Sequence, residues 1–307
     1  MSLWTTGNGW WYCVKRLENM NRPMVCIIVL NWNGLADTQE CLRSLQKLTY
    51  PSHQVILVDN ASAGDDVLHF EREFGDSICL IRNEKNYGFA GGNNIGIRYA
   101  LDHASPDYVF LLNNDTVVAP DLLDELVKAA ENHPEAGILG PKIYYHDFNG
   151  RKDVIWTAGG QIRWWHPWFY HAIGQGHDDL PKYQRLKAVR WISGAAIIIK
   201  RQVLEQISLL NADYFFGGED VEYCLKARTH GFKSIYVPTA RVWHKVGRSR
   251  LKRGPRFEDL PDYFRLLRRN SSLPFYAYHL LISPLLIPTR ILSLLRDALG
   301  VVRRSRS

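Results

Sequence analysis

The sequence predicts an α/β fold with a mixed, mainly parallel β-sheet flanked by helices. Three runs of apolar and β-branched residues, at 24–30, 55–58 and 108–112, have the length of strands that are buried on both faces. Helical spacing over 35–48 and 121–132 places helices after the first and third of these strands. Ligands bind such sheets at the carboxyl ends of the strands, so we expect a functional site at that edge.

The rest of the body continues the alternation of strands and helices. A short strand is expected at 78–81, and a loop rich in Gly and Asn at 86–96 leads into a helix. Later elements are a strand at 192–199, a helix at 201–209, a helix at 220–230 that ends at Gly231, and a strand at 232–237.

Composition excludes several classes of protein. The chain has 307 residues, of which 46% are hydrophobic and 22% are charged, which is typical of a globular protein and not of a disordered or collagenous one. The 5 cysteines are scattered and form no C-x-x-C pair. They therefore argue against a disulfide framework or a structural zinc site and fit a reducing compartment.

Charge is distributed unevenly along the chain. The net charge is +7, but residues 248–307 hold 13 Lys and Arg against 4 Asp and Glu, which leaves the preceding residues slightly acidic. A near-neutral body with a basic tail favours an anionic surface as partner, and it gives little support to nucleic-acid binding. We expect a poorly structured extension at 1–22 without a secretory signal, a body at 23–250 and a helical tail at 251–307.

Polar residues follow three of the predicted strands where each strand ends. They are Asn31 and Asn33, Asp59 and Asn60, and Asn113 and Asp115. Together these residues predict a binding site at one sheet edge, although loops after strands are often polar in any case. Asp115 beside amide neighbours suits Mg²⁺ or Mn²⁺, which substrate phosphates commonly complete; the alternative is that Asp115 only caps the turn before Thr116.

Three further features carry possible chemistry. Glu219 and Asp220 follow two glycines and open a helix, whose dipole keeps an acid ionised and able to act as a base; helix capping is the alternative. His244 follows a strand and could complete a metal site or contact phosphate, although a lone histidine is usually structural. The glycines of loop 86–96 suit a nucleotide or phosphate, but the loop matches neither the dinucleotide-binding nor the P-loop pattern.

The segment 143–191 is rich in aromatic residues separated by Gly and Pro. It could be an irregular ligand-facing region, because aromatic faces pack well on sugars, or the rings could pack in the core under long loops. Its aromatic residues are Trp156, Trp164, Trp165, Trp168, Tyr170 and Trp191.

Seven segments in order resemble glycosyltransferase family 2, and among its members the bacterial rhamnosyltransferases. The resemblance covers about residues 24–250. The segments are IIVLNWNG (27–34), VILVDNAS (55–62), NYGFAGGNNIG (86–96), LLNNDT (111–116), SGAAIIIKR (193–201), FFGGEDVEYCLKA (215–227) and WHKVGRS (243–249).

The resemblance implies a GT-A fold, a nucleotide-diphosphate sugar donor, a divalent metal (Mg²⁺ or Mn²⁺) and inversion at the anomeric carbon. It also implies roles by position. Asp220 is the general base, Asp115 and His244 serve the metal or diphosphate, Glu219 and Trp191 position the acceptor, and the nucleotide is bordered by Asn31, Asp59, Asn86, Gly88, Asn93 and Asn114.

Two departures from the family pattern matter. The D-x-D element is N-N-D here, which leaves one carboxylate and weakens metal dependence without removing it. Many family members have Arg where Asn93 precedes Asn94, so a side-chain contact to the diphosphate is in doubt at this position.

From the residues and the resemblance together, we expect an inverting transferase that adds rhamnose or another hexose to a glycan or lipid-linked acceptor in cell-envelope polysaccharide synthesis. Alternatives are the same fold with a UDP-hexose, UDP-galactofuranose or UDP-N-acetylhexosamine donor, and a catalytically silent module that binds sugar nucleotide or glycan. An oligomer is possible, and nucleic acid is not an expected partner.

The composition of the C-terminal tail predicts where in the cell the protein is located. Between Arg269 and Arg290 no residue is Lys, Arg, Asp or Glu, but Pro274, Pro284 and Pro288 interrupt the segment. Apolar residues flanked by arginines favour an element that lies at the surface of an anionic membrane, which places the protein at the cytoplasmic face of the cell membrane. The alternative is a helical cap on the body.

Overall fold

The computed structural model describes residues 4–6, 9–12, 22–166, 169–214, 217–246 and 259–282. The chain forms two compact units: Met1–Gln161 with Ala172–Lys245, and Ile162–His171 with Val246–Ser307. We call them unit 1 and unit 2. Among the described residues, no helix combines the length and apolar character needed to cross a membrane.

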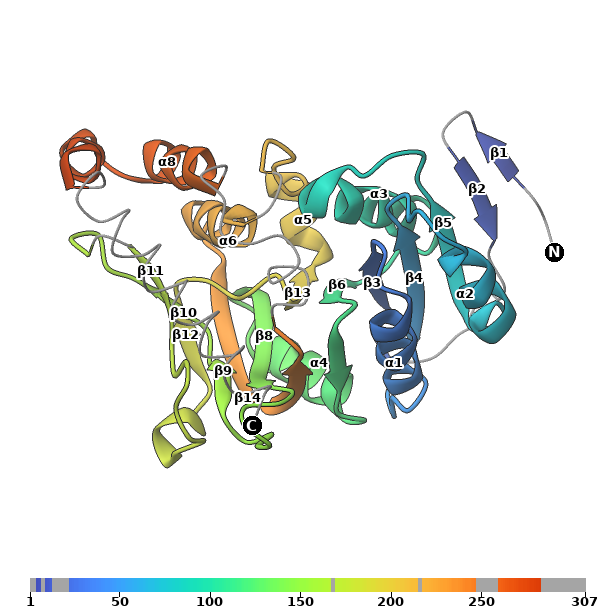
Figure 1. Ribbon diagram of the computed structural model, residues 1–307. Coiled ribbons are helices and arrows are strands. Elements are labelled where there is room, and N and C mark those ends of the chain that lie inside the picture. Colours follow the sequence, from blue (N-terminus) through green and yellow to red (C-terminus); the bar gives the residue numbers. More distant parts are fainter. Residues whose placement is uncertain are drawn as a thin grey trace. The chain divides into compact units, whose positions relative to one another are not determined.

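Unit 1 is built on one large mixed sheet (Figure 1). Its centre is four parallel strands in the order β5-β4-β3-β6, and Asn31 at the end of β3 pairs with Asp59 at the end of β4. The bounds are β3 (Val25–Asn31), β4 (His53–Asp59), β5 (Ile78–Arg82) and β6 (Tyr108–Asn113). These strands agree with the expected buried runs.

Beyond β6 the pairing becomes mostly antiparallel. β13 pairs with β6 and β8 in antiparallel fashion, whereas β14 and β8 are parallel. The parallel character expected for the sheet is therefore confined to the central strands and the β8–β14 pair. The bounds are β7 (Thr116–Val118), β8 (Ala136–Tyr145), β9 (Ile155–Thr157), β12 (Lys187–Val189), β13 (Ala196–Lys200) and β14 (Lys233–His244), and β10 (Gly160–Ile162) pairs with β11 (Tyr170–Ala172) in a separate sheet.

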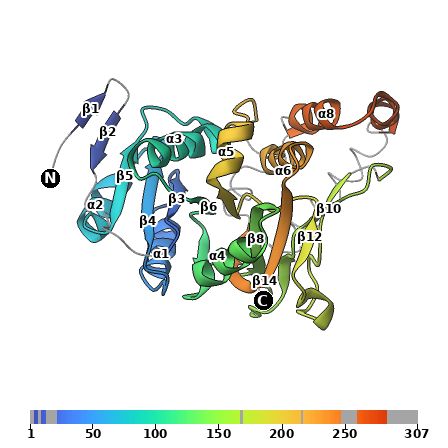
Figure 2. The ribbon, with the colours of Figure 1, turned by 180° about the vertical axis from the view of Figure 1, so that it is seen from behind.

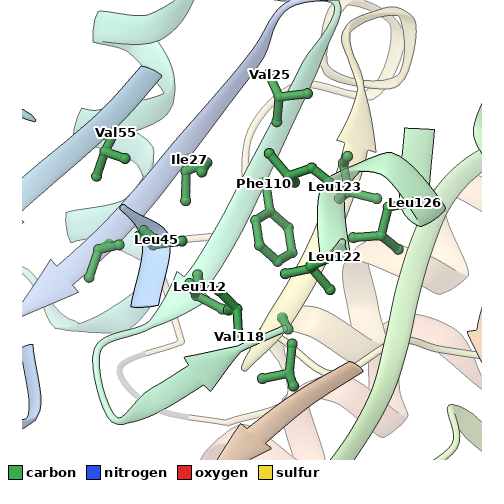
Figure 3. Close-up of a cluster of buried hydrophobic side chains, with 14 of the residues drawn as sticks. Val25, Ile27, Leu45, Val55, Phe110, Leu112, Val118, Leu122, Leu123 and Leu126 are labelled. Carbon is green, nitrogen blue, oxygen red and sulfur yellow. The ribbon is translucent and has the colours of Figure 1, made fainter. Parts of the chain in front are cut away.

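Helices cover both faces of the sheet (Figures 1 and 2). Alternate side chains of β3, among them Val25 and Ile27, enter a core cluster with α1, α2 and α4, part of which Figure 3 shows. On the other face Ile28 lies against Gly96 of α3, where a side chain would not fit. The helices are α1 (Leu35–Leu45), α2 (Asp66–Phe74), α3 (Gly88–His103), α4 (Leu122–Asn132), α5 (Arg201–Ile207) and α6 (Glu219–Thr229), with a 3₁₀ turn η1 (Pro181–Tyr183).

The beginning of the chain differs from expectation. Residues 1–22 are expected to be poorly structured, but β1 (Trp4–Thr6) and β2 (Gly9–Tyr12) form a hairpin, and β2 pairs with β5. Without β2, the strand β5 would be an edge of the sheet with unpaired backbone groups, and such an edge accepts a further strand.

Unit 2 contains α8 (Asp259–Asn270) and a second helical segment at 273–282. Its core includes Leu266, Leu267 and His279, which are fully buried, and the stacked rings of Trp164 and Phe169. The expected tail therefore does not stand alone, because residues 162–171 belong to the same unit. Residues 283–289 of the expected apolar segment, and Trp168, lie outside the described residues.

Candidate functional site

The carboxyl ends of β3 and β4 hold a buried polar network. The Asn31 amide donates to Asp59 Oδ1 at 2.8 Å and to Asp66 Oδ2 at 3.0 Å, and Thr38 Oγ1 donates to Asn31 Oδ1 at 2.7 Å. Ser62 donates to both carboxylate oxygens of Asp59 through its hydroxyl and its backbone N–H. Asn31 and Asp59 are fully buried, so they shape this edge from beneath.

Asn114 and Trp32 lie at the same edge. Asn114 donates to Thr38 Oγ1 at 2.8 Å and also approaches Asn31 Oδ1, so the third strand end joins the network. Trp32 is 53% exposed, directly after the buried Asn31. Trp32 was not among the residues expected at this edge. An aromatic residue in a loop between two asparagines was the available signal, because loops at a strand end commonly carry binding residues.

Asn60 organises the loop at 83–88. Its amide donates to Asn86 Oδ1 at 2.8 Å and to the Gly88 carbonyl at 3.1 Å, while its oxygen accepts from Asn83 Nδ2 and the Tyr87 N–H. All four hydrogen-bonding positions of this buried carboxamide are therefore used within one loop. Gly88 has φ +71°, which favours glycine at the start of α3.

Asn93 and Asn94 face inward from α3. Asn93 is 1% exposed and donates to the Phe89 carbonyl of its own helix, so its amide is directed into the fold. Asn94 forms a pair of hydrogen bonds with the backbone N–H and carbonyl of Leu210. Only Asn94 therefore connects α3 to another segment, whereas the amide of Asn93 stays within its own helix.

Asp115 and His244 come together although 129 positions separate them in the sequence. Pairing of β7 with β14 brings His244 beside Thr116, and His244 Nε2 lies 3.0 Å from Asp115 Oδ1. Burial opposes ionisation of Asp115, but the charge and hydrogen bond of His244 outweigh it and hold the pKa of the carboxyl below its usual value. The ring of Trp156 meets His244 edge-on at 4.5 Å.

These two side chains fit a divalent cation. A carboxylate and an imidazole suit Mn²⁺, and Mg²⁺ prefers the carboxylate. His244 Nδ1 is buried and has no hydrogen-bond partner among the described residues, which leaves a second ring nitrogen uncommitted. Over the described ranges no three His, Cys, Asp or Glu side chains converge into a metal cluster, so water and a ligand would have to complete the coordination.

Lys245 anchors the strand that carries His244. Its ammonium lies 2.7 Å from Asp37 Oδ1 and 2.6 Å from Glu40 Oε2 on α1, and its backbone N–H donates to the Asp115 carbonyl. These contacts fix the end of β14 beside Asp115.

Asp220 and Glu219 stand at the start of α6 in different environments. Gly217 and Gly218 have φ of +101° and +96°, a conformation that glycine adopts readily. Glu219 is 6% exposed and accepts from the Gly217 N–H, whereas Asp220 is partly exposed and accepts from the Gly194 N–H at 2.8 Å. Asp220 is thus the more accessible carboxylate of the pair.

Gly194 lies beside both Asp220 and the first turn of α3. A Cβ at this position would lie 3.2 Å from the Phe89 ring and 3.4 Å from Asp220 Cβ. Phe89 was expected in a loop at 86–96, but α3 already begins at Gly88, so most of that segment is helical. Gly194 was not among the expected site residues.

Trp191 has a packing role in this structure. It is 7% exposed, and its indole covers Gly160, where an added Cβ would lie 1.8 Å from the ring. Its surroundings agree with the core-packing alternative for the aromatic segment, while a contact to an acceptor stays a prediction.

The chain belongs to a known protein family. The family model described as "Glycosyltransferase like family 2" matches residues 23–269. The uncharacterized protein y4gI of Sinorhizobium fredii is 28% identical over 80% of this chain, and the N-acetylglucosaminyl-diphospho-decaprenol L-rhamnosyltransferase of Mycobacterium tuberculosis is 26% identical over 73%. The chain spans 26% of the first relative and 76% of the second.

Solved glycosyltransferases share the GT-A fold with unit 1. The mannosyltransferase PcManGT from Pyrobaculum calidifontis, in complex with GDP-Man and Mn²⁺, aligns with a TM-score of 0.57 and 21% identity. The alignment covers 91% of this chain and 76% of that one.

Proposed function

Because the chain belongs to glycosyltransferase family 2, we propose that it is an inverting transferase that moves a sugar from a nucleotide-diphosphate donor to a glycan or lipid-linked acceptor. The observation that carries this proposal is the arrangement around Gly194, which borders both Asp220 and Phe89 in the first turn of α3. A base and a donor loop must be close if one enzyme is to join two substrates.

Asp220 is the general base of the proposed reaction. Its carboxylate takes the proton of an acceptor hydroxyl while that oxygen forms a bond to the anomeric carbon. The bond from this carbon to the diphosphate oxygen breaks in the same displacement, and the nucleoside diphosphate leaves. Attack opposite the leaving group inverts the anomeric centre. Glu219 supports the turn before Asp220 through the Gly217 N–H, and it takes part in positioning the acceptor.

Asp115 and His244 would hold Mg²⁺ or Mn²⁺, which neutralises charge on the departing diphosphate when bound. The nucleotide is assigned to the edge formed by Asn31, Asp59, Asn86, Gly88 and Asn114. Trp32 offers an exposed ring on which a base or sugar can stack.

Rhamnose from dTDP-rhamnose is the first donor to test, supported by the rhamnosyltransferase relative. The name of that relative also supports a lipid-linked saccharide as acceptor in cell-envelope polysaccharide synthesis, and hence a location at the cytoplasmic face of the membrane. UDP-hexoses, UDP-galactofuranose and UDP-N-acetylhexosamines are the alternative donors. A panel of nucleotide sugars, scored by thermal shift and by donor hydrolysis with Mn²⁺, separates these donors and also detects a silent binding module.

Replacement of the base tests the mechanism. Asp220→Asn keeps an acceptor for the Gly194 N–H but cannot take a proton, so we expect transfer to fall about 10²–10⁴-fold with little change in nucleotide affinity. Asp76→Asn, an exposed acid after α2, is the matched control and should transfer as the wild type does. Transfer by Asp220→Asn at the wild-type rate contradicts the assignment.

A further inference from the structure

The helical segment 273–282 of unit 2 presents an exposed apolar stripe. Leu273 is 79% exposed, Leu281 is 77% exposed and Leu280 is 46% exposed, and Ala277 is exposed between them. Their spacing of four, seven and eight residues from Leu273 places them along one side of a helix. Exposed leucines in such a row usually mark a surface that binds a partner.

The opposite side of this helix is fixed within unit 2. His279 is fully buried, with Nε2 2.8 Å from the Trp164 carbonyl and Nδ1 3.0 Å from the Tyr263 hydroxyl. The Tyr278 hydroxyl donates to the Trp165 carbonyl at 3.0 Å. These contacts hold the helix by one side, so the leucine stripe keeps facing outward.

Two exposed arginines precede the stripe in the chain. Arg268 and Arg269 are exposed at the end of α8, shortly before Leu273. Leucines together with arginines are a side-chain set that favours the boundary between lipid headgroups and acyl chains.

The charge of this segment favours an anionic partner. From Tyr263 to Arg296 the sequence contains no Asp or Glu and five arginines. Such a segment has nothing to repel an anionic surface, and its arginines can pair with phosphate groups. A second copy of this same face would place arginine opposite arginine.

We propose that Leu273, Ala277, Leu280 and Leu281, with Arg268 and Arg269, form a docking surface for an anionic phospholipid bilayer. The helix lies along the membrane, with its leucines among the acyl chains and its arginines at the headgroups. This inference rests on unit 2 and holds whether or not unit 1 transfers sugar.

Vesicle flotation with the full chain tests the proposal. Wild-type protein should float with vesicles of phosphatidylcholine and 30% phosphatidylglycerol, and much less with phosphatidylcholine alone. Leu273→Ser/Leu281→Ser should weaken binding by about tenfold or more for each leucine, because each serine removes the burial of a leucine side chain. Leu68→Ser, at an exposed leucine (60%) on α2, is the control and should bind as the wild type does.

A second variant separates charge from apolar contact. Arg268→Gln/Arg269→Gln should lower affinity for the anionic vesicles by about fivefold for each arginine, and added salt should reduce wild-type binding in the same way. Absence of wild-type flotation with anionic vesicles overturns the proposal. So does wild-type affinity in the leucine variant, or a self-association that the leucine variant abolishes while no vesicle binding is seen. Donor hydrolysis measured without vesicles reports on the proposed transferase separately.

Discussion

Single glycine positions control how side chains meet in unit 1. The indole of Trp191 packs directly on the backbone of Gly160. The Gly160 N–H also donates a hydrogen bond to the Trp191 carbonyl. Glycine is required because the backbone and the ring approach closer than a Cβ would allow, at a position where φ is not unusual. Sterics, and not backbone freedom, therefore select glycine here.

We predict that Gly160→Ala destabilises unit 1. The new Cβ would lie 1.8 Å from Trp191 Cε2 in the middle of the ring system, so the indole must move out of its buried position. Overpacking of this kind lowers the free energy of unfolding by about 1–3 kcal/mol. Urea unfolding followed by circular dichroism measures it. Gly64→Ala, where the nearest atom is 3.7 Å away, should change little, and equal stability of the two variants would contradict the steric argument.

Residue-level prediction from sequence succeeded where one element determines a position. Asn31, Asp59 and Asp115 were expected at a sheet edge because they follow buried strands, and they lie there. The choice of hydrogen-bond partner was not predictable. Asn60 uses its whole carboxamide on a loop that is more than 20 residues away in the sequence. The Asn93 amide bonds to its own helix because α3 is packed in the fold on this side.

At the scale of elements, α3 and α6 are joined through the segment 207–214. Asn94 of α3 holds both backbone groups of Leu210. From α6, Glu222 accepts from Asn211 and Tyr214, and Tyr223 donates to the Ser208 carbonyl. The segment 207–214, which comes before Asp220 in the chain, is therefore held by α3 as well as by α6.

We predict that Asn94→Asp impairs transfer more than nucleotide binding. The carboxylate loses the donor to the Leu210 carbonyl and faces that oxygen with another acceptor, which loosens 207–214 and hence the start of α6. We expect kcat to fall about tenfold or more, whereas the affinity for UDP or dTDP with Mn²⁺, measured by calorimetry, changes less. Asn132→Asp, exposed at the end of α4, is the control. A loss confined to nucleotide affinity would disagree with coupling through this segment.

Elements with clear periodicity were predictable, and those with mixed signals were not. The strands β3, β4 and β6 and the helix α4 agree with their apolar runs and helical spacing. β8 was not recognised, since Gly137, Gly140 and Pro141 within it are typical of a broken strand. In the structure Gly140 allows Ile192 to approach to a distance that no Cβ would tolerate, so the glycine lets β8 pack against the segment before β13. That segment was expected to be part of a strand at 192–199, but β13 begins only at Ala196.

At the scale of the whole molecule, the division of charge in the sequence corresponds only in part to the division of the fold. The sequence placed a boundary near residue 250, and unit 1 ends at Lys245. It could not indicate that 162–171 joins the C-terminal helices, because the contacts of Trp164 with His279 and Phe275 span more than 100 residues. Such long-range pairing leaves no periodic pattern in the sequence.

The stability of unit 1 depends on a buried cation far from the proposed site residues in sequence. The Lys142 side chain is 2% exposed, and its ammonium donates to both oxygens of Asp179 at 2.9 Å and to Gln184. The Tyr144 hydroxyl also donates to Asp179. Burial opposes ionisation of Asp179, but the bonds from Tyr144 and Lys142 outweigh it and lower the pKa of the carboxyl.

A lowered pKa in the folded state makes the ionised form of Asp179 stabilising above the pKa of an unfolded Asp, about 3.9. This contribution should persist through neutral pH and be lost as the pH falls through the folded-state pKa. Asp179→Asn removes it at every pH and leaves Lys142 buried without a carboxylate, so we expect the free energy of unfolding at pH 7 to fall by about 3–5 kcal/mol. Urea unfolding of both proteins from pH 7 down to the acid limit measures the difference, which should narrow on acidification. Asp153→Asn, whose partner Arg151 is half exposed, should have little effect. A difference that stays constant down to pH 2 would mean that the Asp179 charge does not stabilise unit 1.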